Sequence, residues 1–205
     1  MLIESLLAQE DVFMLARISS WFYRVSQGYA ALVGVIVFVL FGALVLPREA
    51  ARAEQISGGA GSPDTNLLYS AQDLYDLAEI YGPDGRSAYV RVRFTFDVAF
   101  PLVYGFFLVT AISWLGARVL PEKSSWRLAN LVPVLGAVFD FLENSFASIV
   151  MIRYPAATSF AANLAPWLSL TKWVFVYGSF AILGSLLIMW GFRSLINGKG
   201  ERSGG

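Results

Sequence analysis

The sequence contains no cysteine and no histidine, and charged residues make up only 15% of its 205 residues. Without cysteine, the chain has no disulfide, no thiol nucleophile and no thiolate ligand for zinc or an iron–sulfur cluster. Without histidine, it lacks a His-based catalytic triad and the usual ligand for haem, zinc or copper. Carboxylates and carbonyls alone remain as metal ligands, and we expect no metal site and no cofactor.

The charges are also balanced in sign, with 15 Lys and Arg against 15 Asp and Glu. A neutral chain is a poor match for nucleic acid, which calls for a basic face, so we expect no nucleic-acid partner. Hydrophobic residues make up 57% of the chain, and the charged fraction lies below the ~25% typical of soluble domains. The composition therefore predicts a membrane protein whose length suits a single domain, residues 1–205.

Four apolar stretches are long enough to cross a hydrocarbon core of ~30 Å as helices that rise ~1.5 Å per residue. These expected transmembrane helices are residues 28–46, 94–116, 128–152 and 166–192. The sequence therefore predicts an all-α fold, a bundle of four transmembrane helices followed by a tail at residues 193–205.

Residues 1–25 precede the first span and are rich in leucine, phenylalanine and tryptophan. One helical face of this segment is apolar and carries Ile3, Leu7, Met14, Ile18 and Trp21. The pattern favours a helix that lies on the membrane surface, and the alternative is an extension of the first span. Acidic residues ahead of the first span argue against a signal peptide.

The long connection at residues 48–93 contains segments with distinct structural preferences. Residues 55–63 read QISGGAGSP, a composition typical of a flexible segment. Ser70 and Asp73 then have the spacing of a capping box. Apolar residues at helical spacing follow, which predicts a short helix at about residues 71–81.

The end of this connection is ambiguous. Residues 82–85 read GPDG, a sequence that ends a helix. Residues 89–96 alternate between apolar and polar side chains like a strand, but they have no evident partner strand. We therefore favour a helix that begins at about Arg86 and runs into the second span.

Lysine and arginine in short connections favour both termini in the cytoplasm. On that side lie Arg17, Arg24, Arg118, Lys123, Arg127, Arg193, Lys199 and Arg202. The connection at residues 48–93 then lies outside the cytoplasm, and the expected location is the inner (cytoplasmic) membrane of a bacterium.

The second and third spans carry ionisable residues, which usually face the interior of a bundle. Asp140, Glu143 and Asn144 share one small-residue face of the third span, and the opposite face is bulky and apolar. Asp97 and Tyr104 share a face of the second span. By helical rise, Tyr104, Glu143 and Asn144 should lie in one layer, ~15 Å below the outer surface.

Two partners are open for Asp97, namely Lys172 on the fourth span or Arg93 on its own helix. Tyr177 lies ~140° around the fourth helix from Lys172, so the two cannot both face one site. Lys172 could instead extend outward to the membrane surface. No lysine or arginine is expected at the depth of the third-span carboxylates, so we expect one of these carboxyl groups to hold a proton.

Several spaced residues form a recognisable pattern: Ser70-x-x-Asp73-x-Tyr75, Tyr81-Gly82-x-x-Gly85-Arg86-x-x-Tyr89, Asp97-x-x-x-Pro101-x-x-Tyr104 and Asp140-x-x-Glu143-Asn144. The pattern resembles a group of uncharacterised bacterial four-helix integral membrane proteins. The resemblance covers about residues 70–190, and it implies a topology and no activity.

The intramembrane carboxylates have two interpretations, interhelical hydrogen bonds that hold the bundle together or a proton-carrying or ligand-binding site. We favour a non-catalytic role, as an accessory or scaffold subunit or a lipid-binding protein. Its partners would be membrane lipid and either the subunits of a membrane complex or further copies of itself. One alternative is an enzyme acting on a lipid or isoprenoid, with Glu143 as general acid/base assisted by Asp140 and Tyr104. The other is an oligomeric small transporter or proton relay.

Overall fold

The computed structural model describes residues 2–63 and 68–202, with the side chains of residues 10, 13–63 and 68–196. Within these residues the chain forms helices and no strand. Four helical stretches are long and apolar enough to cross a membrane, Gly28–Ser57, Ala71–Val119, Ser125–Arg153 and Ser159–Ile196. The expected all-α class with four spans is confirmed at this level, and the lengths and composition of the helices indicate a membrane protein.

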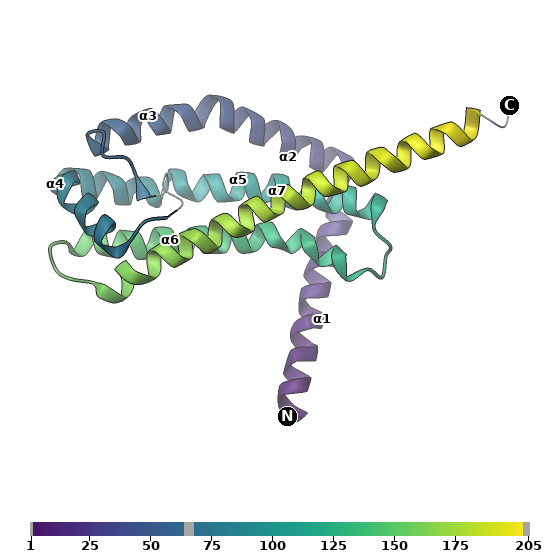
Figure 1. Cartoon of the computed structure of the whole chain (residues 1–205), viewed down its shortest axis with the longest axis horizontal. Helices are drawn as coiled ribbons and strands as arrows, with labels where there is room; N and C mark the ends of the chain where they lie inside the picture. The colour runs from purple at the N-terminus through teal and green to yellow at the C-terminus, as the bar shows by residue number, and fades with distance from the viewer. Residues whose placement is uncertain (1, 64–67, 203–205) are drawn as a thin grey trace.

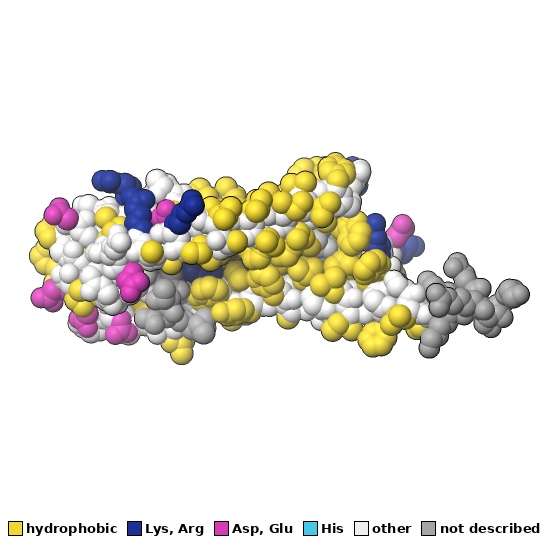
Figure 2. All heavy atoms as spheres, turned by 90° about the horizontal axis from the view of Figure 1, so that it is seen from above, with side chains coloured by type: hydrophobic (Ala, Val, Ile, Leu, Met, Phe, Trp, Pro, Cys, Tyr) yellow, Lys and Arg dark blue, Asp and Glu magenta, His cyan; other side chains and the backbone are white. Residues whose placement is uncertain are grey.

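Three helices form the centre of the bundle: α5 (Phe96–Val119), α6 (Val132–Arg153) and α7 (Ser159–Arg202). Each packs against the other two, and α2 (Gly28–Leu40) packs on α5. Figure 1 shows these helices running along one common direction. Figure 2 shows hydrophobic side chains over the middle of one face and charged side chains toward the two ends. An apolar middle between polar ends is typical of a bundle that spans a bilayer.

The first span belongs to a longer helical stretch than residues 28–46. After α2 the chain makes a π-helical turn, Phe41–Val45, and continues as α3, Leu46–Ser57. Pro47 does not end the helix: it lies in the first turn of α3, a position in which proline is tolerated. The stretch ends at Gly58, whose φ of 60° is left-handed and easily adopted by glycine. Residues 55–57 are therefore helical and do not belong to a flexible segment.

Helix α4 (Ala71–Arg93) begins with a capping box between Ser70 and Asp73. The backbone N–H of Asp73 donates to Ser70 Oγ at 3.2 Å, and the backbone N–H of Ser70 donates to Asp73 Oδ2 at 2.7 Å. The helical path breaks at Gly82, where φ is 61° and ψ is 179°. The helix resumes with Pro83, a residue suited to the first turn of a helix.

The ambiguous stretch at residues 89–96 is helical as far as Arg93 and forms no strand. Phe94 and Thr95 then interrupt the helix before α5 begins. The helix that we expected from Arg86 into the second span is therefore broken at this point.

The fourth span begins earlier than its apolar stretch suggested, because α7 starts at Ser159 and includes Pro166. A proline at this place removes one backbone hydrogen bond, which packing against α6 compensates. Ala162 and Ala165, both 0% exposed, let the two helices approach closely. The expected tail at residues 193–205 is helical to Arg202, and residues 203–205 lie outside the described residues.

Helix α1 (Leu2–Val25) is not an extension of α2, because the helix is interrupted at Ser26 and Gln27. Figure 1 shows α1 leaving the bundle at a steep angle, at the end where the C-terminus also lies. Asn130, which is 0% exposed, anchors the C-terminal part of α1 to the bundle. Ser19 Oγ donates to Asn130 Oδ1 at 2.8 Å, and Asn130 Nδ2 donates to the Ser19 carbonyl at 3.1 Å and to Ser113 Oγ at 3.0 Å.

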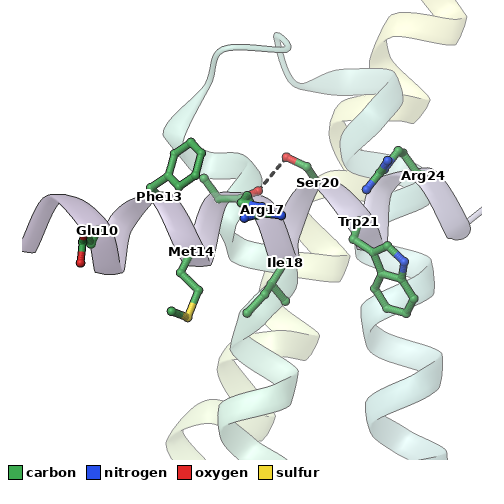
Figure 3. Close-up of a pocket in the computed structure, with 9 residues that line it drawn as sticks. Glu10, Phe13, Met14, Arg17, Ile18, Ser20, Trp21 and Arg24 are labelled. Atoms are coloured by element: carbon green, nitrogen blue, oxygen red, sulfur yellow. Dashed lines mark hydrogen bonds between the residues drawn. The ribbon is translucent and has the colours of Figure 1, made fainter.

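One side of the exposed part of α1 is apolar. In Figure 3, Met14, Ile18 and Trp21 point to the side along which the spans run, and Phe13, Ser20 and Arg24 point to the opposite side. All described residues that line the hollow drawn in Figure 3 come from α1. The hollow is therefore a feature of the surface of this helix and does not lie between helices. The side chains of Ile3 and Leu7 lie outside the described residues.

Candidate functional site

Helix α6 presents Asp140, Glu143 and Asn144 to the interior of the bundle, where they are 7%, 0% and 3% exposed. Their helical spacing places all three on one face. Gly136 lies on the same face and allows α7 to come close. A Cβ atom added there would lie 3.3 Å from Val176 Cγ2 on α7. The small and polar face of the third span is therefore the face that meets the fourth span.

Lys172 on α7 is the principal partner of these carboxylates. Its Nζ lies 2.5 Å from Glu143 Oε2 and 3.8 Å from Asp140 Oδ1, and the residue is 5% exposed. The expectation that no cation lies at this depth is thereby wrong. Two alternatives that the sequence left open are also excluded, because Lys172 neither pairs with Asp97 nor extends to the surface. The early start of α7 is the reason. Lys172 lies about 20 Å along the axis from Ser159, and Glu143 about 15 Å from the end of α6.

Two tyrosines and an amide complete the cluster. Tyr104 OH donates to Asp140 Oδ2, Tyr69 OH donates to Glu143 Oε1, and Asn144 Nδ2 donates to Asp140 Oδ1, each at 3.3 Å. Burial and the neighbouring Glu143 carboxylate raise the pKa of the Tyr69 phenol, so it remains a donor near neutral pH.

The structure thus brings together five of the residues singled out from the sequence, Tyr104, Asp140, Glu143, Asn144 and Lys172. We call these five residues with Tyr69 the lysine cluster. It joins α5, α6, α7 and the segment before α4 through buried polar contacts. Lys172 offsets one of the two carboxylate charges, and the expectation that one carboxyl group holds a proton stays a prediction.

Asp97 belongs to a second cluster, in which its partner is Arg93. The Arg93 Nη1 atom lies 2.5 Å from Asp97 Oδ2, and Nη2 donates to Ser62 Oγ at 2.7 Å. The guanidinium carbon is 4.3 Å from the centroid of the Tyr89 ring, within the range of a cation–π interaction. Of the two possible partners of Asp97, Lys172 and Arg93, the structure therefore shows that Arg93 forms the ion pair.

A cavity of about 380 Å³ lies between α2–α3, α5 and α7 and reaches both clusters. Its polar lining includes Arg93, Asp97, Tyr104, Asp140 and Lys172. Its apolar lining includes Phe38, Phe96, Phe100, Pro101, Trp173, Val176 and Phe180. A volume of this size is comparable to small-molecule pockets, which hold about 300–1,000 Å³. An apolar cavity with a few polar side chains in its lining is suited to an amphiphilic molecule.

Tyr177 is the singled-out residue that the lysine cluster does not include. It is 56% exposed and lines the cavity, with its ring centroid 5.3 Å from that of Trp173. Lys172 and Tyr177 both line this cavity, so the prediction that the two cannot face one site is wrong. Only Lys172 also reaches the lysine cluster, because it lies ~140° around the helix from Tyr177.

Sequence reasoning missed Tyr69, Ser62 and the aromatic lining of the cavity. Tyr69 directly precedes the helix cap at Ser70, and Ser62 lies in the irregular segment before α4. Helical periodicity does not place the side chains of such segments, so the sequence carried no signal for these two contacts. The sequence identified the aromatic residues only as apolar residues of the spans. They line a cavity because α2–α3 and α7 stand apart, and this separation is a feature of the tertiary structure.

The chemistry available here is binding through charged, hydroxyl and aromatic groups. Within residues 2–63 and 68–202, no group of three or more His, Cys, Asp or Glu side chains is arranged to hold a metal ion. Compared with known proteins, the chain matches no family model, no curated protein and no solved structure.

Proposed function

We propose that the protein is a non-catalytic, lipid-binding component of a membrane, and that the cavity between α2–α3, α5 and α7 is its binding site. The single observation that carries the proposal is the lining of this cavity. Aromatic and aliphatic side chains cover most of it, and polar side chains from two ion-paired clusters also line it. Sites for small amphiphilic molecules combine an apolar lining with a few fixed polar groups in this way.

The geometry of Glu143 favours binding over acid–base catalysis by this residue. Glu143 is 0% exposed, and Lys172 and Tyr69 contact its two carboxylate oxygens. It is absent from the described lining of the cavity. A general acid or base has to come within hydrogen-bond reach of the reacting group. A molecule in the cavity would meet Asp140 and Tyr104 before it met Glu143.

Native mass spectrometry after gentle extraction tests the proposal. Ala53 on α3 lines the cavity, and Ala53→Trp would fill part of it. Ala51 lies on the same helix, is exposed and is not among the lining residues, so Ala51→Trp is the matched control. We expect the wild type and Ala51→Trp to carry bound lipid and Ala53→Trp to lose it.

Two results would contradict lipid binding in this cavity. One is a wild-type protein that carries no small molecule when it is extracted gently from its own membrane. The other is an Ala53→Trp variant that retains the same lipid at the same occupancy as the wild type.

We further propose that both termini face the cytoplasm of a bacterium. The support is the charge at the end of the bundle where α1 and the C-terminus lie. More basic than acidic side chains are described there. Its described basic residues are Arg17, Arg24, Arg118, Lys123, Arg127 and Arg193, against Glu10 and Glu122. Figure 2 shows several carboxylates at the opposite end, together with some Lys and Arg side chains. Reporter fusions after Gly59 and at the C-terminus should report opposite sides, and a cytoplasmic Gly59 would overturn this orientation.

Helix α1 would then lie on the cytoplasmic surface of the membrane. Its support is the steep angle to the bundle and the apolar side formed by Met14, Ile18 and Trp21 (Figure 3). A helix in the interface buries such a side and keeps arginine in water. Brominated lipids should therefore quench the fluorescence of a protein whose only tryptophan is Trp21, and full exposure of Trp21 to aqueous quenchers would refute this placement.

A further inference from the structure

We propose that the cavity selects an amphiphile with a single hydrocarbon chain and an uncharged hydroxyl head, such as a long-chain or isoprenoid alcohol. This inference rests on the proposed lipid-binding function and adds the chemical class of the ligand. It follows from three properties of the cavity: its charges, its remaining hydrogen-bonding capacity and its size.

The charges of the lining disfavour an anionic head. The charged residues that line the cavity are Glu49, Arg93, Asp97, Asp140 and Lys172, so the lining has no excess of cations. Both cations are also engaged, Arg93 with Asp97 at 2.5 Å and Lys172 with Glu143 at 2.5 Å. A phosphate head would have to separate a buried ion pair and approach the freed carboxylate, and both changes cost free energy.

The hydrogen bonds of the lining leave capacity for one donor and one acceptor. Asp140 accepts from Tyr104 and Asn144 at 3.3 Å each, and Lys172 Nζ stands 3.8 Å away, so its carboxylate is loosely held for a buried group. Trp173 Nε1 is buried and has no hydrogen-bond partner in the part of the chain that the structure describes.

Both groups lie near Lys172. The Lys172 Nζ atom is 5.1 Å from the centroid of the Trp173 ring and 3.8 Å from Asp140 Oδ1. A hydroxyl group both donates and accepts a hydrogen bond. Beside Lys172 it can therefore donate to the Asp140 carboxylate or accept from Trp173 Nε1, and neither ion pair is disturbed.

The apolar lining fits one hydrocarbon chain. Rings from three helices come together there, with Phe38 and Phe180 centroids 6.1 Å apart and Phe96 and Phe100 centroids 6.5 Å apart. The volume of about 380 Å³ lies at the lower end of the ~300–1,000 Å³ range for small-molecule pockets. That space suits a single chain and is small for the two acyl chains of a phospholipid.

Three ligands with one tail and different heads test the inference: farnesol, farnesyl phosphate and farnesylamine. Each is titrated into the full-length protein in lipid nanodiscs, and binding is followed by calorimetry. We expect farnesol to bind at least tenfold more tightly than either of the others. Trp173→Phe removes one donor from the cavity and should weaken farnesol about threefold to tenfold, the effect of one neutral hydrogen bond. Trp167→Phe is the matched control, because Trp167 is 67% exposed and does not line the cavity.

The outcomes separate this inference from the proposed function. Tighter binding of the phosphate or the amine, or an unchanged farnesol affinity in Trp173→Phe, overturns the hydroxyl assignment. If none of the three ligands binds, but the wild type carries another lipid that Ala53→Trp loses, the hydroxyl inference fails and lipid binding stands. If no ligand binds and the wild type carries no lipid, both proposals fail.

Discussion

Replacing Lys172 with methionine tests whether the lysine cluster holds the bundle together. At an effective dielectric constant of ~20, unit charges attract by about 7 kcal/mol at 2.5 Å and about 4 kcal/mol at 3.8 Å. Desolvation of the buried lysine offsets several kcal/mol of this attraction. Lys172→Met keeps the volume of the side chain but leaves Glu143, 0% exposed, without its cation. Removal of one partner of a buried pair typically costs about 3–5 kcal/mol, and we expect a loss of this size.

The assay is equilibrium unfolding in mixed micelles with increasing sodium dodecyl sulfate, followed by circular dichroism. Lys123→Met is the matched control, since Lys123 is exposed in the connection between α5 and α6. The double variant Lys172→Met/Glu143→Gln should recover part of the loss, because it removes both charges of the shortest pair. A Lys172→Met protein within 1 kcal/mol of the wild type, on the scale of a surface pair, would refute the buried ion pair.

Three further variants test other contacts of the bundle. Gly34→Leu should cost at least about 1–3 kcal/mol of unfolding free energy by overpacking, because even a Cβ there would lie 2.8 Å from a side-chain oxygen on α5; Gly184→Leu, where no atom lies within 4 Å, should leave stability unchanged. Asn130→Leu removes the buried hydrogen bonds at the base of α1, so hydrogen exchange of α1 should quicken, and an unchanged rate would contradict this anchor. The pKa of Tyr69 is raised above its usual 10.0 in the folded protein, so its contribution to stability is present below about pH 10 and lost as the pH rises further; the wild type should lose more stability than Tyr69→Phe in an alkaline titration of unfolding, and equal losses would exclude this contribution.

The sequence was most informative where one local property decides the outcome. An uninterrupted apolar stretch must form a helix in a bilayer, because no water satisfies its backbone groups, and the four spans were found on this ground. Ser70 and Asp73 were recognised from spacing alone, since a capping box involves only neighbouring residues. The polar face of Asp140, Glu143 and Asn144 followed from helical geometry in the same way.

Local rules were less reliable where packing competes with them. The expected spans ended before Pro47 and began at Pro166, and in both places the helix continues. Pro47 lies in the first turn of α3, and packing against α6 compensates the hydrogen bond that Pro166 removes. The shift of the start of α7 from residue 166 to Ser159 also changed the expected depth of Lys172. An error of seven residues, about 10 Å along a helix, was enough to assign this lysine to the wrong carboxylate.

The sequence by itself determined the all-helical class, the four apolar stretches and the polar inward face of the third span, because these depend on composition and on the period of a helix. Only the tertiary structure decided which inward residues meet. It paired Lys172 with Glu143 and Arg93 with Asp97, brought Tyr69 from an irregular segment into the lysine cluster, and formed a cavity between α2–α3, α5 and α7. The physical reason is that ion pairs and cavities depend on the relative shift and rotation of separate helices, which the packing of side chains sets and no local pattern records.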